Sequence, residues 1–322
     1  MKIAMVAGGH VAIPAPGWGA VEILIWNYKH YLERAGHTVD IYNSLWYHEV
    51  IEQLNHREYD FIHLQFDLYS GAFAKHLTKP FCVTSHFGGF ATYVPGLTHP
   101  HYDILFRDML EAPGNIVFLE RAADIFRQNG YSGFLRLLRN PVETEQFRFA
   151  PRGNGRAICL GKIQPRKRQA WLAGLLRDRV PLDFAGPFDP ADAPDFKPGG
   201  RARYLGNWNR DTVYQRLTDY NCLVLLSKSE GDALVVKEAL AAGLSVVVNE
   251  ASSANLTDEP FISVLPDEEQ SAEPISRAIA EAIDRNDLLR PLVRAYAFRR
   301  FDYGVVIEEY LQIIDEFRSY YG

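Results

Sequence analysis

Short apolar runs alternate with segments of helical periodicity along the first half of the chain. The runs hold four to six residues rich in Val, Ile and Phe, and segments with a helical pattern separate them. Such buried strands separated by helices are typical of a parallel sheet covered on both faces. We therefore expect a doubly wound α/β domain with strands at 3–7, 38–42, 61–64, 81–84, 116–119 and 134–138, and a helix over 20–35.

A second series of the same kind begins after residues 147–155, where Pro, Gly and Asn replace the periodic pattern, as at a domain boundary. The chain thus predicts two Rossmann-like domains, 1–148 and 149–304, followed by an amphipathic helix over about 305–322. Ligands of such sheets bind at the carboxyl ends of the strands. In the second domain we expect strands at 157–160, 182–185, 202–205, 222–226 and 245–248, and helices at 167–177, 211–218, 234–242 and 273–284.

Composition narrows the class of protein. A length of 322 residues fits two domains, and a net charge of −6 argues against nucleic acid as a partner. Cys82, Cys159 and Cys222 each lie in apolar surroundings and predict buried thiols in a reducing compartment. Neither a signal segment nor an apolar run of ~18 residues is present, so we expect a cytoplasmic protein with at most transient membrane association.

The strongest chemical signal follows the apolar run 222–226. Glu230 is expected in the loop after this strand, and Glu238 lies eight positions later, within the next helix. The backbone amides at Ala233, Leu234 and Val235 would open that helix and form a site for an anion such as a diphosphate. The two glutamates can accept hydrogen bonds from sugar hydroxyls. By themselves, they would also fit a capping carboxylate and a surface helix residue.

A basic loop follows the strand at 157–160. Lys162 and Lys167 lie in it, and their cations would stabilise a bound anion. A solvated surface loop is the alternative.

In the first domain, a loop with Gly17 and Gly19 separates the first strand from the first helix, and such glycines let backbone approach a phosphate closely. The nearby Gly8-Gly9-His10 segment lacks the G-x-G-x-x-G pattern, which argues against a dehydrogenase.

Polar residues also end two strands of the first domain. His86 stands directly beyond the run 81–84, either as a ligand of substrate or as a group that satisfies the strand end. On the strand before it, His63 is expected to be a core residue, while Gln65 and Asp67 are candidates for a ligand-binding site.

These segments, in this order, resemble motifs of the retaining glycosyltransferases of family 4, which have the GT-B fold. Segment 230–238 resembles their E-x7-E motif, 161–168 their G-R-x-x-x-x-K-G loop and 14–22 their P-P-x-G-Y-G-G-x-E loop. Segment 60–65 is similar to D-x-x-H-x-H, and the likeness extends from Ile3 to about Tyr310. Among the departures from these motifs, Lys162 replaces Arg, Ala20 replaces Gly and Gln65 replaces the second His.

The resemblance implies two Rossmann-like domains facing each other across a cleft, with the last helix returning to the first domain. It implies retaining sugar transfer from a nucleoside diphosphate sugar to a hydroxyl, without a metal or other cofactor, and the sequence contains no D-x-D. The catalytic residues would be Glu230, His86 and Lys167. Donor binding would involve Gly17, Gly19, Ala20, Lys162, Lys167, Asn207, Glu230, Ala233, Leu234, Val235 and Glu238, and acceptor binding Glu22, Gln65, Asp67 and Phe87.

The acceptor implied by the resemblance is a carbohydrate, a lipid-linked sugar or a small molecule, in polysaccharide, glycolipid or glycoconjugate synthesis. Two other functions remain open at this point. One is a sugar-nucleotide epimerase or hydrolase of the same fold. The other is a non-catalytic module that binds a sugar nucleotide.

Overall fold

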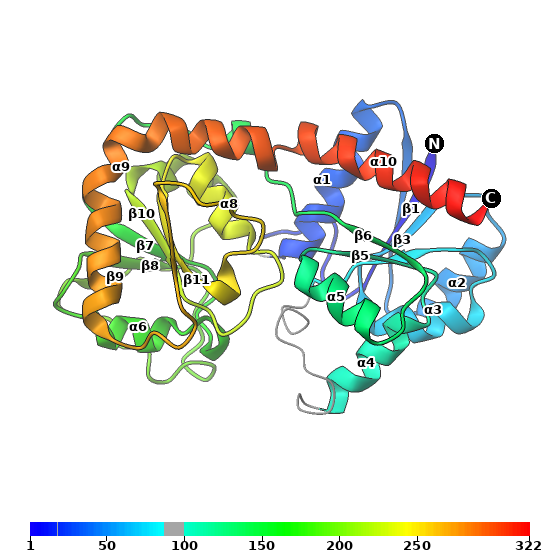
Figure 1. Ribbon diagram of the computed structural model, residues 1–322, viewed down its shortest axis with the longest axis horizontal. Helices are drawn as coiled ribbons and strands as arrows, with labels where there is room; N and C mark the ends of the chain where they lie inside the picture. The colour runs from blue at the N-terminus through cyan, green and yellow to red at the C-terminus, as the bar shows by residue number, and fades with distance from the viewer. Residues whose placement is uncertain (18, 87–99) are drawn as a thin grey trace. The chain divides into compact units, whose positions relative to one another are not determined.

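The computed structural model describes residues 1–17, 19–86 and 100–322 (Figure 1). Its contacts divide the chain into two units. The N-terminal unit comprises Met1–Asn140 together with Tyr303–Gly322, and the C-terminal unit comprises Pro141–Asp302. Each unit has one six-stranded sheet with helices around it.

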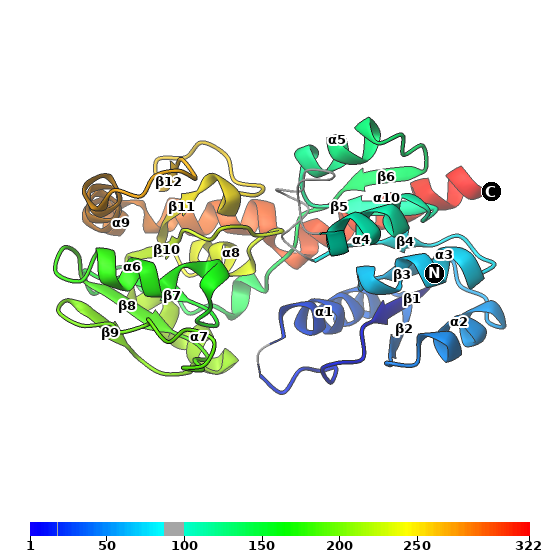
Figure 2. The same cartoon turned by 90° about the horizontal axis from the view of Figure 1, so that it is seen from below.

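The sheet of the N-terminal unit is parallel throughout, in the order β2-β1-β3-β4-β5-β6 (Figure 2). Because every strand runs the same way, all carboxyl ends meet at one edge, where the connecting loops can assemble a site. The strands are β1 (Lys2–Ala7), β2 (Thr38–Asn43), β3 (Phe61–Leu64), β4 (Cys82–Val83), β5 (Gly114–Val117) and β6 (Phe134–Leu137).

Helices cover this sheet, and one of them comes from the far end of the chain. Helix α10 (Tyr303–Tyr321) buries an apolar stripe, and its Phe317 ring lies 5.1 Å from that of Phe61 and 5.2 Å from that of Phe134. The sequence pattern predicts this amphipathic stripe. The other helices are α1 (Ala20–Arg34), α2 (Tyr47–Asn55), α3 (Ser70–His76), α4 (Pro100–Leu110) and α5 (Glu120–Gln128), with a 3₁₀ turn η1 (Asp67–Tyr69).

The sheet of the C-terminal unit is also parallel, in the order β12-β11-β10-β7-β8-β9. The edge strand β12 is absent from the sequence-based expectation, because it is only half-buried and includes a polar Ser263 and an exposed Val264. The strands are β7 (Ala157–Leu160), β8 (Leu182–Ala185), β9 (Ala202–Tyr204), β10 (Cys222–Leu225), β11 (Ser245–Asn249) and β12 (Ile262–Leu265).

Two apolar layers sandwich this second sheet. Helix α6 (Gln169–Leu175) and the start of α9 (Ala272–Phe301) belong to one layer, and α7 (Arg210–Arg216) and α8 (Leu234–Ala241) belong to the other. Helix α9 extends well beyond the predicted 273–284. It continues through Pro291, and since proline lacks an amide donor, this residue accounts for a bend in α9 (Figure 1).

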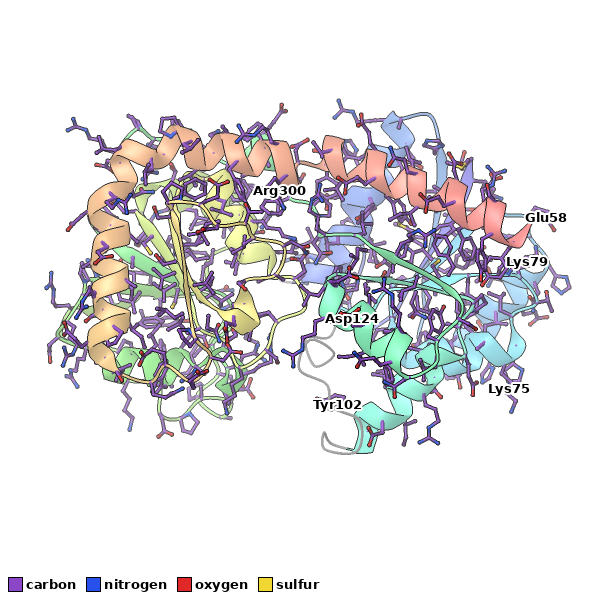
Figure 3. All side chains as sticks on the ribbon, in the orientation of Figure 1. Glu58, Lys75, Lys79, Tyr102, Asp124 and Arg300 are labelled. Carbon is purple, nitrogen blue, oxygen red and sulfur yellow. The ribbon has the colours of Figure 1, made fainter. Side chains whose placement is uncertain are left out.

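The surface and the core differ as expected for a globular chain. Exposed ion pairs such as that between Lys79 and Glu58, 3.1 Å apart, lie at the periphery (Figure 3). Cys82, Cys159 and Cys222 are buried free thiols, as predicted. Within the described ranges, the model contains no helix that combines the length and the apolar character of a membrane span.

Candidate functional site

The loop after β7 brings a lysine against the backbone. Gly161 has a φ of 140°, in the region that favours glycine, and a Cβ built there would lie 3.1 Å from Nζ of Lys167. The 3₁₀ turn η4 (Pro165–Lys167) then precedes α6. A side chain at position 161 would crowd the amino group of Lys167. Glycine therefore leaves room for this amino group at the carboxyl end of the sheet.

Two cations converge on Glu230 in the loop after β10. Nη1 of Arg166 lies 3.1 Å from Oε2 of Glu230, and Nζ of Lys167 lies 3.7 Å from its Oε1. Ser227 donates a hydrogen bond of 2.7 Å to the same Oε1. The side chain of Glu230 is only 10% exposed and that of Lys167 only 15%. Partial exclusion of water strengthens this cluster, which we call the cation–carboxylate cluster (Arg166, Lys167 and Glu230).

Lys162 lies elsewhere. Its side chain is 53% exposed, and its Nζ is 2.9 Å from Oδ2 of Asp192. The hydrogen bond and the charge of Asp192 raise the pKa of Lys162. The structure therefore joins Lys167 to Arg166 at Glu230, and the donor-binding role of Lys162 stays a prediction. Arg166 is absent from the predicted site residues, although Pro165 before it favours a tight turn.

Helix α8 holds the second glutamate. Ala233 is its N-cap residue and makes no side-chain capping bond, and Leu234 and Val235 form the first turn. Glu238 is buried and forms an ion pair with Arg210 of α7. The Arg210 guanidinium lies 4.4 Å from the ring centre of Tyr214. Burial lowers the pKa of Arg210, but Glu238 and Tyr214 outweigh this effect, and the net pKa is raised.

The loops after β8 and β9 lie against the Lys167 loop. A Cβ at Gly186 would stand 2.3 Å from the carbonyl oxygen of Gly161, so these two backbones touch. Tyr204 donates a hydrogen bond of 2.8 Å to the carbonyl of Gly186. Asn207 follows in an exposed loop. Its place near the carboxyl end of β9 is consistent with the predicted donor-binding role, which stays a prediction.

In the N-terminal unit, polar residues at the ends of β3 and β4 form a second cluster. Nε2 of His86 lies 2.6 Å from Oε1 of Gln65, and Nε2 of Gln65 lies 2.9 Å from Nδ1 of His63. His63 is buried, as expected for a core residue. Burial lowers the pKa of His86 to about 4, and burial together with His86 lowers the pKa of His63 to about 3. We call His63, Gln65 and His86 the histidine–glutamine cluster.

The remaining candidates of this unit lie around the same sheet edge or outside the described part. Asp67 is buried and accepts a hydrogen bond from Ser85, and burial raises the pKa of Asp67. Gly17 and Gly19 precede α1, which begins at Ala20, and Glu22 lies in its first turn. A Cβ at Gly19 would stand 2.9 Å from Oε2 of Glu22. Phe87 lies outside the described residues.

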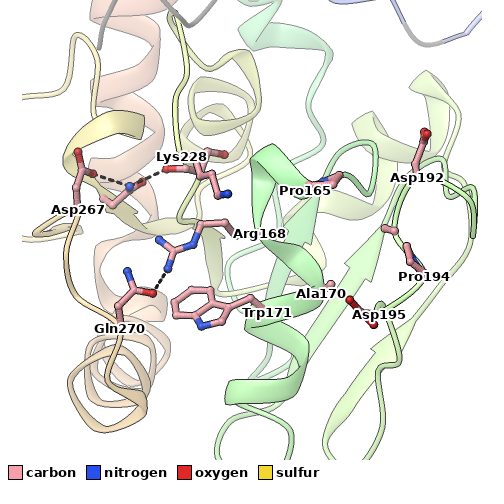
Figure 4. Close-up of a pocket in the computed structure, with 13 residues that line it drawn as sticks. Pro165, Arg168, Ala170, Trp171, Asp192, Pro194, Asp195, Lys228, Asp267 and Gln270 are labelled. Atoms are coloured by element: carbon pink, nitrogen blue, oxygen red, sulfur yellow. Dashed lines mark hydrogen bonds between the residues drawn. The ribbon is translucent and has the colours of Figure 1, made fainter. Parts of the chain in front are cut away.

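A pocket of about 740 Å³ opens beside α6 (Figure 4). Trp171, Asp192 and Asp267 are among the residues that line it, and Arg168 stacks on Trp171 with 3.8 Å between guanidinium carbon and ring centre. Most of its polar groups already have partners: Arg168 is bonded to Gln270, Asp267 to Asn249 and Asp192 to Lys162. Such a lining gives no clear preference for one ligand class.

Metal ligands do not gather anywhere in the part of the chain that the structure describes: no group of three or more His, Cys, Asp or Glu side chains is placed to hold an ion there.

Comparison with known proteins gives the fold. No protein-family model matches the chain, and neither does any curated protein. Sucrose-phosphate synthase from Thermosynechococcus elongatus is similar, with a TM-score of 0.77 and 16% identity over 99% of both chains.

Two further structures agree with this similarity. Anabaena HepE in complex with UDP-glucose has a TM-score of 0.74 and 15% identity, over 98% of this chain and 100% of its own. AviGT4, a glycosyltransferase involved in avilamycin A biosynthesis, has a TM-score of 0.70 and 17% identity, over 99% and 98%. The protein thus has the two-domain α/β fold of GT-B type that the sequence predicts.

Proposed function

We propose that this protein is a glycosyltransferase that moves a sugar from a nucleoside diphosphate sugar to a hydroxyl acceptor, with retention of configuration, as in family 4. The observation that carries the proposal is the cation–carboxylate cluster at the carboxyl end of a sheet in a chain of GT-B fold. Fold alone would not indicate an activity. The cluster adds the charge that the chemistry needs.

Sugar transfer breaks the bond between the anomeric carbon and the phosphate oxygen, and negative charge grows on the leaving diphosphate. Arg166 and Lys167 provide two cations that are already held in place by Glu230. Such preorganised charge is worth a few kcal/mol per group in a site that excludes water. The backbone amides at the start of α8 would add partial positive charge for the same phosphates.

Retention follows from attack on the face that the diphosphate leaves. In this mechanism the acceptor oxygen bonds to the anomeric carbon on that face, and the leaving phosphate takes the acceptor's proton. Glu230 interacts with two cations and with Ser227, so it is better suited to orient donor hydroxyls than to attack carbon. Glu238, which forms an ion pair with Arg210 in this structure, would accept hydrogen bonds from the ribose in place of that pair. We propose that the protein's own cations make a divalent metal unnecessary.

We propose a UDP-sugar as the first donor to test, since HepE is described with UDP and with UDP-glucose. The acceptor would be a carbohydrate, a lipid-linked sugar or a small molecule in polysaccharide, glycolipid or glycoconjugate synthesis.

The test incubates the protein with UDP-, GDP-, ADP- and dTDP-sugars and a panel of sugar acceptors, with chelator present. We expect release of one nucleoside diphosphate and a product whose anomeric configuration, read by NMR, equals that of the donor. Glu230→Ala should lower release at least ~100-fold, and Glu268→Ala, at an exposed glutamate, serves as the matched control. An epimerised nucleotide sugar without acceptor would contradict transfer, as would donor binding with no turnover, hydrolysis included.

A further inference from the structure

We propose that Gln65 is a positioning residue, which holds His86 as its Nε2–H tautomer and so makes Nδ1 of His86 an acceptor for a sugar hydroxyl. The tautomer is assigned from hydrogen bonds within the N-terminal unit, and its use by a sugar rests on the proposed function. Gln65 occupies the position where the resembling motif has a second histidine.

Donors and acceptors in this cluster can be assigned beginning with the main-chain carbonyl of Ile116. Thr84 Oγ1 lies 3.1 Å from the carbonyl oxygen of Ile116 in β5, and a carbonyl can only accept. The single hydroxyl proton of Thr84 is therefore used there. Thr84 Oγ1 also lies 2.8 Å from Nε2 of His63, so it must accept from that nitrogen. His63 consequently has its proton on Nε2.

The position of the proton on His63 in turn fixes the orientation of the Gln65 side-chain amide. With Nε2 protonated, Nδ1 of neutral His63 has one lone pair, and two donors share it: the amide group of Gln65 at 2.9 Å and the hydroxyl of Tyr310 at 2.8 Å. The amide nitrogen of Gln65 thus faces His63, and its carbonyl oxygen faces His86. That oxygen can only accept, so Nε2 of His86 must donate across 2.6 Å.

The reversed arrangement leaves a bond unmade. If the amide of Gln65 were turned round, Nδ1 of His63 would donate to it, and the lone pair on Nε2 of His63 would need the proton of Thr84. Thr84 has one hydroxyl proton, so it could no longer bond both the carbonyl of Ile116 and the ring of His63. The assigned arrangement keeps both hydrogen bonds of Thr84.

Both rings are neutral, which the assignment requires. Burial depresses the pKa of His63 to about 3 and that of His86 to about 4. Among the described residues, Nδ1 of His86 has no hydrogen-bond partner, whereas Nε2 has Gln65. The amide of Gln65 does not titrate near neutral pH, so it keeps the same orientation where a histidine at this position would change charge.

The tautomer can be read directly by ¹⁵N NMR of histidine-labelled protein at neutral pH, without substrate. We expect a pyridine-like Nδ1 and a pyrrole-like Nε2 for His86, and the same pattern for His63. Gln65→Met removes the acceptor and should give His86 a mixture of tautomers, while Thr84→Ser keeps the hydroxyl and should leave the spectrum unchanged. A protonated Nδ1 in wild-type His86, or an unchanged His86 in Gln65→Met, would overturn the proposal.

Kinetics then separate positioning from a structural role. Gln65→Met should lower kcat about tenfold with the affinity for the nucleoside diphosphate unchanged, as expected for one misplaced hydrogen bond. Gln65→Glu places a carboxylate beside His86, which raises its pKa, so the acid limb of the pH profile should move to higher pH. An acid limb at the same pH in Gln65→Glu as in wild type would contradict the proposed effect of residue 65 on His86. The predicted tautomer together with absence of sugar transfer would count against the proposed function alone.

Discussion

The two polar clusters of this protein differ in charge: one is ionised and the other is neutral. The cation–carboxylate cluster of the C-terminal unit concentrates full charges, with Glu230 between Arg166 and Lys167. The histidine–glutamine cluster of the N-terminal unit is built from neutral groups, and burial removes the proton that either histidine would otherwise gain in mild acid. Both clusters lie at carboxyl ends of parallel strands.

The difference follows from what each cluster offers a ligand. A buried charge is tolerated where opposite charges and hydrogen bonds meet it, as around Glu230, while a histidine with only neutral partners stays neutral. Under the proposed function, charge is present where a diphosphate leaves, and neutral acceptors and donors are present where sugar hydroxyls bind.

The largest effect is expected from removal of the central carboxylate. Glu230→Ala should lower turnover at least ~100-fold, because Arg166 and Lys167 lose the group that orients them and the donor loses an acceptor. Initial rates of nucleotide release measure the effect. A rate near that of wild type would show that the charged cluster does not serve the reaction.

Two lysines of one loop form a matched pair. Lys167→Ala should also lower turnover at least ~100-fold, whereas Lys162→Ala, at an exposed residue paired with Asp192, should cost less than about tenfold. Steady-state kinetics of both variants under identical conditions decide the matter. Equal losses of turnover would indicate that both lysines bind the diphosphate, as the sequence motif predicts.

The ion pair between Arg210 and Glu238 tests what an unpaired buried charge costs in stability. Arg210→Met leaves Glu238 without its cation, and the free energy of unfolding should fall by about 2 kcal/mol. Arg277→Met, in an exposed pair with Glu273, provides the control and should change little. Denaturant unfolding measures both variants, and similar losses would contradict the special position of the Arg210–Glu238 pair.

The neutral cluster should make stability depend on pH. The folded pKa values of His63 and His86 lie below the ordinary 6.5, so below that pH the unfolded chain binds more protons and stability falls as pH drops towards 4. Each histidine contributes a slope of about 1.4 kcal/mol per pH unit. His63→Gln should reduce the slope and the exposed His48→Gln should not. Identical slopes in urea titrations would refute a neutral buried His63.

Sequence periodicity predicted much of the fold because buried parallel strands are short apolar runs. Strands Phe61–Leu64, Ala157–Leu160 and Leu182–Ala185 agree with the prediction to the residue. Edge strand β12 and the extension of α9 through Pro291 escaped it. An edge strand needs only one packed side, and a helix held by tertiary contacts tolerates a proline that local rules treat as its end.

The candidate site was predicted in part for a similar reason. Strand-end residues such as Gln65 and His86 lie 21 positions apart in sequence, and the adjacent parallel strands β3 and β4 bring them together. The convergence of Arg166 on Glu230 depends on the exact turn of η4, which pattern alone does not specify. Hydrogen-bond direction requires atoms, so the tautomer of His86 emerges only from the structure.

The central claim is that Arg166 and Lys167 bind the diphosphate of a donor. Thermal unfolding with UDP, GDP, ADP or dTDP, with chelator present, tests it most directly, because a ligand at ~100 times its dissociation constant stabilises a fold by about 2.7 kcal/mol. We predict a clear rise in Tm with one of these nucleotides, lost in Lys167→Ala and kept in Gln65→Met. No rise with any nucleotide, or an equal rise in Lys167→Ala, would contradict the account.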